Sequence, residues 1–378
     1  MSAPTKSTST TTTPTTLPLT ITNNSGQPSS SIYVYIIGLN ENGDWAYLNQ
    51  QGVLTAIALS DNDPTTGYTD WSLPFPATGP ATFNLPPMSS GQVYVSFGEK
   101  LKISVNSSAG QPGGLGWTAP SGWTPTDPNY DTIYADVEFT YTSSGLMNCD
   151  TTYVDMFTVP MTLELTGSMG TQTAGGLTAS RTDVFNAFAT AAAPLPSLIV
   201  GSNVRILNPQ HAIGVTSFPS DYLDQAISAA WTNYQTNTLT VTISGTAYTG
   251  TVDSTTNALT FTPGSIGLPT TLEVFACSGV FVPPMSNPPT TDQTELAAIA
   301  AAVAAALNRG TLLSNASQPA CDSSKFYQTT SNGYAQLLHQ YSTGGQCYAF
   351  PYDDVCGTYS SDLNDPAATG LALTLNAF

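Results

Sequence analysis

The sequence predicts a mainly β protein that carries an inserted mixed α/β unit. Short runs rich in β-branched and aromatic residues, bounded by Gly, Pro or Asn, fill the first 180 residues and return near the C-terminus. Helical patterns gather between residues 181 and 319 instead. We therefore expect a disordered Ser/Thr/Pro-rich arm over 1–16, a β sandwich or barrel over 17–180 and 320–378, and a mixed α/β domain over 181–319.

Each expected strand of the β domain is short and ends near a turn-forming residue. In the first part of the chain these strands cover 17–22, 32–37, 92–97, 100–105, 134–142 and 151–161. Two more are expected near the C-terminus, over 345–354 and 370–376, with an acidic turn between them. Because strands are expected in both the first and the last segments of the chain, we expect one β domain that is interrupted by an insertion.

The inserted unit is expected to alternate helices with strands. The expected helices are 182–192, 220–231 and 292–309, and the expected strands are 238–243, 246–252 and 258–261. Thr182 is the expected N-cap of the first helix. Asp292 and Glu295, three residues apart, form the expected capping pair of the longest helix.

The composition excludes several classes of partner. Only 8% of the 378 residues are charged, against roughly 25% in an average domain. The formal net charge is −18, from 25 acidic and 7 basic residues, and the bases are scattered. Nucleic acid and anionic membrane surfaces need clustered Lys and Arg, so neither is expected. A neutral polysaccharide meets no repulsion from an acidic surface.

Other catalytic chemistry is scarce. The chain has two histidines, His211 and His339, too few for a zinc site with several His ligands, and His339 on a short amphipathic helix is interpreted as structural. No nucleophile-elbow, metalloprotease or nucleotide-binding motif is present, so no metal or cofactor is expected. The five cysteines suit disulfides, and Cys347 and Cys356 could bridge a short loop.

The N-terminus and the hydropathy bear on localisation. No run of about 18 apolar residues occurs, so a membrane-spanning helix is not expected. The first residues lack the apolar stretch of a signal peptide. We expect a secreted, monomeric protein whose leader is not part of this chain, with export by another route or an intracellular location as the alternatives.

Two acidic residues seventeen positions apart carry the main functional hypothesis. Strand alternation puts Asp136 and Glu138 on one face, about 6.6 Å apart, and like charges that close raise a carboxyl pKa. Asp155 is expected to share a strand face with Tyr153 and Phe157. The linker 143–150 would pair the two strands and direct both acids into one groove. A carboxyl pair of this kind can hydrolyse a glycosidic bond, although an ordinary solvated strand face is the alternative.

Aromatic residues precede this pair in a Gly/Pro-rich loop. Trp117, Trp123 and Tyr130 could stack on pyranose rings, and packing back onto the core is an equal alternative. Asp353 and Asp354 are weaker candidates for substrate binding, because adjacent acids in a turn are usually solvated.

Three motifs then resemble a known family. Val-Glu-Phe-Thr at 137–140, Tyr-Val-Asp-Met-Phe-Thr-Val-Pro-Met at 153–161 and Tyr-Ala-Phe-Pro-Tyr-Asp-Asp-Val at 348–355 resemble the thaumatin-like superfamily, and most closely its glycoside hydrolase family 64, the β-1,3-glucanases. Further stretches agree in the expected order: 17–24, 93–101, 274–279, 307–312 and 334–339.

The resemblance implies a thaumatin-like β domain and a mixed α/β domain that form a crescent around a wide acidic groove. It implies endo-acting, inverting hydrolysis of β-1,3-glucan of the laminarin or curdlan type to short oligosaccharides. The family's catalytic acid falls on Glu138 and its base on Asp155, with Asp136 as the first alternative base. A non-catalytic β-glucan-binding protein of the same fold is the rival function.

The resemblance also implies how sugars are held. The family's sugar-contacting hydroxyls fall on Thr140 and Thr152, and its Asn in the same region aligns with Thr142. The family's tryptophan between the two acids is missing, because Met147 or Asn148 stands there. That sugar subsite is therefore expected to differ in this chain.

Overall fold

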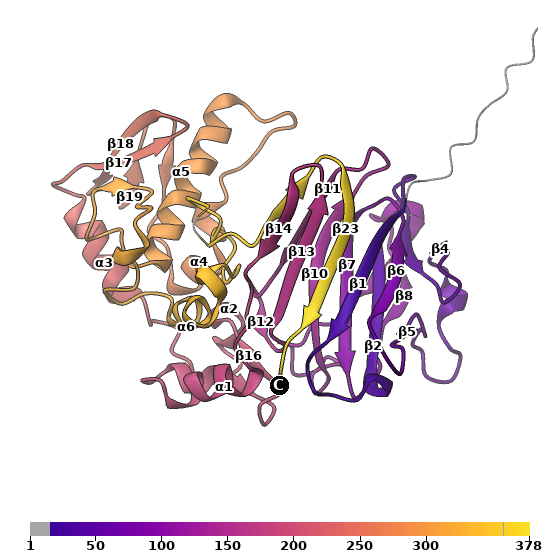
Figure 1. The fold of residues 1–378 in the computed structure, drawn as a ribbon. Helices are drawn as coiled ribbons and strands as arrows, with labels where there is room; N and C mark the ends of the chain where they lie inside the picture. Colours follow the sequence, from indigo (N-terminus) through magenta and orange to yellow (C-terminus); the bar gives the residue numbers. More distant parts are fainter. Residues whose placement is uncertain (1–15, 358) are drawn as a thin grey trace, which may run out of the picture.

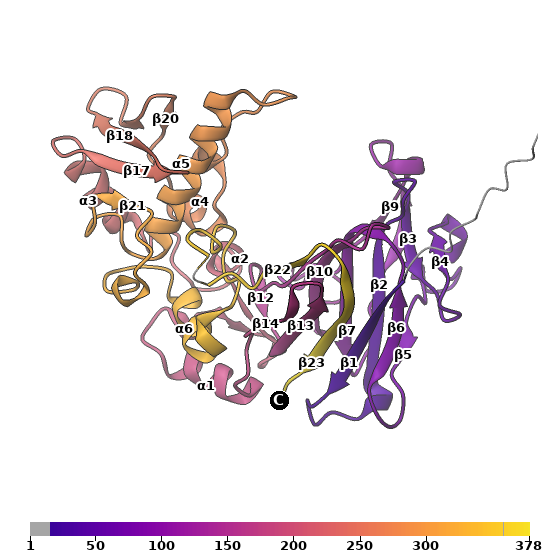
Figure 2. The same ribbon diagram turned by 45° about the horizontal axis from the view of Figure 1, so that its top comes forward.

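The computed structural model describes residues 16–357 and 359–378, which form two lobes (Figures 1 and 2). We call residues 16–180 with 359–378 the β lobe and residues 181–357 the mixed lobe. The predicted arm over 1–16 lies outside the described residues except for its last residue. The predicted β domain included 320–357, but this segment lies beside the mixed lobe in both views, so we propose that the second boundary falls after residue 357.

Two sheets face each other in the β lobe. The first has five strands, in the order β14 (Gly170–Ala174), β13 (Met161–Gly167), β23 (Ala368–Leu375), β1 (Leu17–Asn23) and β6 (Ala81–Leu85). The second has the order β22 (Leu363–Asp365), β11 (Met147–Thr151), β10 (Ile133–Tyr141), β7 (Met88–Phe97), β2 (Ile32–Leu39), β3 (Trp45–Leu48) and β4 (Leu54–Ala56), with β5 (Leu73–Pro74) on β2. Among the described strands neither sheet closes on itself, so the sandwich holds and the barrel alternative is wrong.

The sandwich is held by the alternation that the sequence predicts. Leu17, Leu19 and Ile21 on β1 are buried, as are Val137 and Phe139 on β10, and all five belong to one core between the sheets. The C-terminal strand β23 pairs in parallel with β1, which joins the two ends of the described chain in one sheet. The expected strand over 100–105 is largely wrong, because only β8 (Ser104–Ser107) forms there, paired with β9 (Leu115–Thr118).

The mixed lobe combines short sheets with helices. One sheet has the order β20 (Ser265–Ile266), β19 (Ala258–Thr260), β18 (Thr246–Asp253), β17 (Leu239–Ile243) and β21 (Ser317–Gln318). The helices are α1 (Arg181–Thr190), α2 (Pro209–Ala212), α3 (Asp224–Asn233), α4 (Thr271–Ala276), α5 (Thr291–Asn308) and α6 (Gly333–Tyr341). A small sheet of β12 (Met156–Phe157), β16 (Arg205–Leu207) and β15 (Ile199–Val200) connects the lobes, because β12 belongs to the β lobe and β16 belongs to the insertion.

Both predicted helix caps are displaced by two residues. Ser180, not Thr182, caps α1 by accepting a hydrogen bond from the Asp183 amide. Thr290 with Gln293, not Asp292 with Glu295, forms the capping box of α5. In both cases a hydroxyl residue at the last extended position takes the cap, since its side chain reaches the exposed amides of the first turn.

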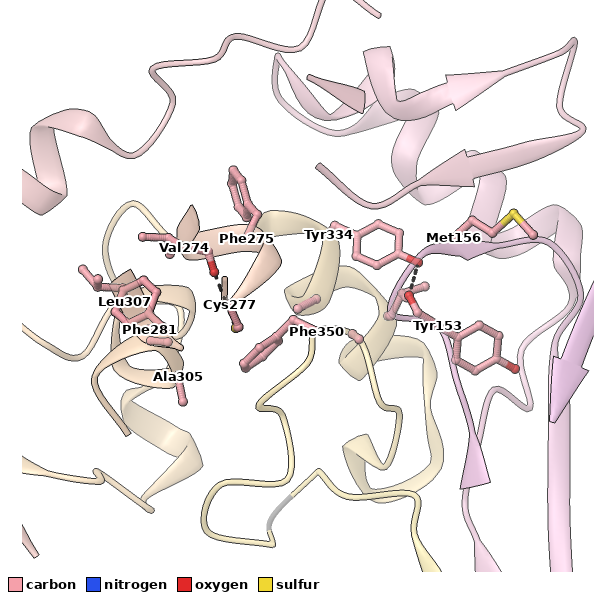
Figure 3. Close-up of a cluster of buried hydrophobic side chains, with 14 of the residues drawn as sticks. Tyr153, Met156, Val274, Phe275, Cys277, Phe281, Ala305, Leu307, Tyr334 and Phe350 are labelled. Atoms are coloured by element: carbon pink, nitrogen blue, oxygen red, sulfur yellow. Dashed lines mark hydrogen bonds between the residues drawn. The ribbon is translucent and has the colours of Figure 1, made fainter. Parts of the chain in front are cut away.

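The two lobes share a continuous hydrophobic core. One cluster of buried side chains extends from Tyr94 in the β lobe through Tyr153 to Phe275 and Leu307 in the mixed lobe. Figure 3 shows Tyr334 of α6 pointing at the Tyr153 segment, where its hydroxyl donates to the Tyr153 carbonyl at 2.7 Å. The packing therefore holds the segment that leads into Asp155 against the mixed lobe.

The expected strand over 345–354 is wrong, since this segment forms turns apart from a single bridge between Tyr348 and Thr152. The Asp353 carboxylate lies buried inside those turns and accepts from the Ala349 amide at 3.1 Å, which closes the chain locally. The disulfide joins Cys321 to Cys356, not Cys347 to Cys356. No helix within 16–357 or 359–378 is long and apolar enough to cross a membrane.

Candidate active site

Two hollows on the second sheet meet at Glu138. The first has a volume of about 360 Å³, and its lining includes Trp45, Gln92, Glu138, Thr140, Asn148 and Asp150. The second has a volume of about 140 Å³, and its lining includes Tyr94, Trp123, Asp136, Glu138, Thr152 and Asp155. Glu138 thus separates a larger hollow from a narrow one that holds three carboxyl groups.

Strand β10 positions the acids of this site by simple alternation. Asp136, Glu138 and Thr140 face the hollows, whereas Val137 and Phe139 enter the sandwich core, as predicted. Glu138 stands opposite Asp150 on β11 and Gln92 on β7. Side chains directly opposite in antiparallel strands lie close together, so Asp150 joins the acidic group that sequence analysis limited to three residues.

The carboxyl groups raise one another's proton affinity. Burial, together with the charges of Glu138, Asp155 and Asp150, raises the pKa of Asp136 to about 8. Burial raises the pKa of Glu138, and the charge of Asp155 adds to the effect. Burial and the charge of Glu138 raise the pKa of Asp150 to about 7. No Lys or Arg lies among the described lining residues to offset these charges.

Asp155 reaches the site by a route that strand alternation does not predict. The chain bends at Val154 and Asp155 ahead of β12, so the expected shared face with Tyr153 and Phe157 is wrong. Both aromatic rings are buried, whereas the Asp155 side chain is 47% exposed and points into the narrow hollow. His211 Nε2 lies 2.6 Å from Asp155 Oδ1.

The remaining predicted contacts divide into those that reach the hollows and those that do not. Thr140 lines the large hollow, and Thr152 and Trp123 line the narrow one. Thr142 lies in the turn after β10, where its hydroxyl pairs with that of Ser144 at 2.8 Å. It is not among the residues that line either hollow.

Four residues that were expected to contact the substrate are not among those that line the two hollows: Trp117, Tyr130, Asp353 and Asp354. Trp117 packs edge-on against Trp45 and Tyr94, with ring centroids 5.9 and 6.1 Å apart, and Tyr130 lies over the Arg205 guanidinium at 5.6 Å. Asp353 is fully buried beside Arg309 and His339, so its predicted role in substrate binding is wrong. Asp354 is exposed but lines neither hollow.

Sequence reasoning missed several residues of the site, among them Asp150, Trp45, His211 and Asp362, an acid that lines the large hollow. Asp150 could have been found, because it stands opposite Glu138 if the predicted hairpin is drawn in register. Trp45 lines the large hollow from β3 and donates through Nε1 to Gln111 at 3.0 Å. His211 lies 56 residues beyond Asp155 in the chain, and no pattern in the sequence connects the two.

Asp136→Asn is expected to raise the melting temperature at pH 8. The ordinary Asp pKa of 3.8 rises to about 8 in the folded protein, so the folded state binds the extra proton between about pH 4 and pH 8. Stability contributed by the protonated group is complete below pH 4 and is lost as the pH rises toward 8. Asparagine removes this loss, and each kcal/mol gained adds roughly 1–2 °C in a chain of 378 residues.

Thermal melts at pH 4, 6 and 8 measure this effect. We expect the variant and the wild type to agree at pH 4 and to diverge as the pH rises. Asp221→Asn, on an exposed side chain of the mixed lobe, serves as the control. A constant difference between Asp136→Asn and wild type at all three pH values would exclude the titration as its cause.

The chain is similar in sequence to known carbohydrate-active proteins. The sequence model of the family described as Beta-1,3-glucanase matches residues 15–375. A glucan endo-1,3-beta-glucosidase of Cellulosimicrobium cellulans is 30% identical in an alignment that covers 79% of this chain and 54% of that protein. This chain thus spans about half the length of the curated relatives it matches.

Two solved structures share the fold. A laminaripentaose-producing beta-1,3-glucanase in complex with laminaritetraose has a TM-score of 0.83 and 29% identity, over 97% of this chain and 99% of that one. A beta-1,3-glucanase domain from Clostridium beijerinckii has a TM-score of 0.80 and 26% identity, over 96% and 98%. The two-lobed arrangement predicted from the motifs is therefore confirmed along nearly the whole chain.

Proposed function

The chain belongs to the β-1,3-glucanase family, and from that premise we propose that it hydrolyses β-1,3-glucan by an endo-acting, inverting single displacement. One observation carries the proposal. Glu138 and Asp155, which the family motifs mark as acid and base, come from different elements and line the same narrow hollow. Laminarin and curdlan represent the expected class of substrate.

The environments of the two carboxyls support separate roles. Burial and the charge of Asp155 raise the pKa of Glu138, which favours the protonated form that a general acid needs. Asp155 is half exposed and accepts a hydrogen bond from His211 or holds it as an ion pair, an environment that suits a carboxylate acting as base. Inversion requires room for a water between the two groups, at a carboxyl separation of about 6.5–9.5 Å.

Sugar rings are proposed to occupy both sides of Glu138. The large hollow offers the Trp45 ring together with polar groups of Thr140 and Asn148. An aromatic face and hydroxyl-binding groups are the usual means of holding a neutral sugar, and the surrounding carboxylates do not repel it. The two hollows meet at Glu138, so sugar rings could lie on both sides of the scissile bond, which supports cleavage within a chain.

Incubation with laminarin tests the proposal directly. We expect new reducing ends, and we expect the α-anomer as the first product when the reaction is followed by NMR, because inversion converts the β linkage. Curdlan serves as a second substrate, and a β-1,4-glucan serves as the negative control. No reducing ends after long incubation, with glucan still bound, would leave the non-catalytic binding protein as the function; a β-anomer first would exclude inversion.

A further inference from the structure

We propose that His211 is a positioning residue that engages one oxygen of Asp155 and so assigns the other oxygen, Oδ2, to the attacking water. The inference rests on the proposed function and names a residue outside the two motif carboxyls. His211 comes from α2 of the mixed lobe, so the insertion would supply part of the catalytic geometry.

The side-chain hydrogen bonds to the Asp155 carboxylate reach the same one of its two oxygens. His211 Nε2 lies 2.6 Å from Oδ1, and Gln210 Nε2 lies 3.4 Å from the same oxygen. Gln210 Nε2 also donates to the Val154 carbonyl at 2.9 Å, next to the bend. Among the described residues no hydrogen bond reaches Oδ2, while the side chain remains 47% exposed in the narrow hollow. Oδ2 is therefore the oxygen free to accept a proton from water.

The imidazole ring is itself held in place. It stacks on the Trp123 indole with ring centroids 4.5 Å apart and an angle of 19° between the planes. Asn208 caps α2, since its side chain accepts from the Gln210 amide at 3.0 Å and donates to the Ala349 carbonyl at 2.9 Å. The Asn208 amide also donates to the Asp155 carbonyl at 2.9 Å. A ring fixed by stacking and by its helix cap can direct a carboxylate without reorganising.

The same segment holds the loop that carries Trp123. Arg205 on β16 is fully buried and donates to the carbonyls of Gly122 and Thr132, the latter at 2.6 Å. The Gly122 amide donates to the Tyr134 hydroxyl at 2.7 Å, and a side chain at Gly122 would collide with the Arg205 guanidinium. Residues 205–211 therefore supply His211 and, through Arg205, also hold the loop whose Trp123 ring stacks on His211.

The charges around this contact are almost entirely negative. Glu138 and Asp136 face Asp155 across the narrow hollow, with Asp150 behind them on β11. The charge of Asp155 also acts on the hydroxyls of Tyr94 and Tyr334. Both hydroxyls remain protonated, because burial raises the pKa of each well above its usual value. Among these groups His211 Nε2, at 2.6 Å, is the nearest hydrogen-bond partner of the Asp155 carboxylate.

The proton balance of the proposed step is simple. Glu138 gives its proton to the glycosidic oxygen as the bond from the anomeric carbon breaks. Water bonds to that carbon from the opposite face and gives its proton to Asp155 Oδ2. The two carboxyls return to their starting states by exchange with solvent, and His211 keeps its bond to Oδ1 throughout.

Two variants of His211 separate a donor from a packing residue. His211→Phe keeps a ring to stack on Trp123 and loses the hydrogen bond, whereas His211→Gln restores a donor of similar reach. We expect His211→Phe to lower kcat on laminarin roughly 10- to 100-fold with little change in KM. His211→Gln should recover much of this loss in kcat, which a residue that only packs on Trp123 would not show.

Val215→Ala, on the exposed turn after α2, is the matched control and should behave as the wild type. Circular dichroism confirms folding, and His211→Ala replaces His211→Phe if the latter does not fold. An unchanged kcat in His211→Phe beside an active wild type overturns the inference alone, as does a His211→Gln variant that is no better than His211→Phe. A wild type without turnover overturns the proposed function and the inference together.

Discussion

Glu138→Gln and Asp155→Asn should each abolish turnover of laminarin while leaving glucan binding largely intact. Each substitution keeps the shape of the side chain and removes the proton transfer, and general acid or base catalysis typically contributes about 10²–10⁴-fold. Binding survives because the aromatic ring and the hydroxyl groups of the large hollow are untouched. Reducing-end assays measure turnover, and co-sedimentation with insoluble curdlan measures binding.

Exposed acids elsewhere provide matched controls for these two changes. Glu164→Gln on β13 and Asp221→Asn in the mixed lobe make the same chemical substitutions far from the hollows and should keep the wild-type rate. A near-normal rate for Asp155→Asn would show that the base is wrongly assigned. Asp136 would then be the next residue to test, because it lines the same hollow.

Asp353→Ala should cost about 3–5 kcal/mol in the free energy of unfolding, the largest stability effect expected in this protein. Asp353 Oδ1 lies 3.2 Å from Arg309 Nη2, and Oδ2 lies 2.7 Å from His339 Nε2. All three side chains are buried, so the substitution leaves a buried guanidinium without its carboxylate. The Ala349 amide also loses its hydrogen bond to the Asp353 carboxylate, which closes the turns of this segment.

Urea denaturation followed by tryptophan fluorescence measures this loss. Asp354→Ala, at the exposed neighbouring acid, is the control and should change stability by no more than about 0.5 kcal/mol. A loss below about 1 kcal/mol for Asp353→Ala would mean that the buried Arg309 finds another partner or water.

Local patterns predicted the parts of the molecule that depend on neighbouring residues. Alternation along 134–142 placed Asp136, Glu138 and Thr140 on one face, and the structure has them there. The strand over 17–22 formed with the same alternation, whereas the continuous apolar run over 32–37 formed a strand that is buried along most of its length. The same rule failed over 151–161, where a bend at Val154 and Asp155 ends the alternation.

Two adjacent acids show why burial could not be predicted from residue type. Asp353 and Asp354 are alike in the sequence, yet one is enclosed by Arg309 and His339 and the other is exposed. The difference depends on partners 44 and 14 residues away from Asp353. Only the packing of α5 and α6 around the turn brings those partners together.

Residue patterns alone predicted part of the sandwich, including the strands β1, β2, β7, β10 and β23, together with the order of the motifs and hence the family. They also placed Glu138 on a solvent-facing strand position. Only the tertiary structure showed that Asp155 leaves its strand and that His211 meets Asp155 from the other lobe. The physical reason is the separation along the sequence between the residues on which each feature depends. Alternation follows from the geometry of consecutive residues, whereas a contact between residues 56 positions apart exists only once both lobes pack on their shared core.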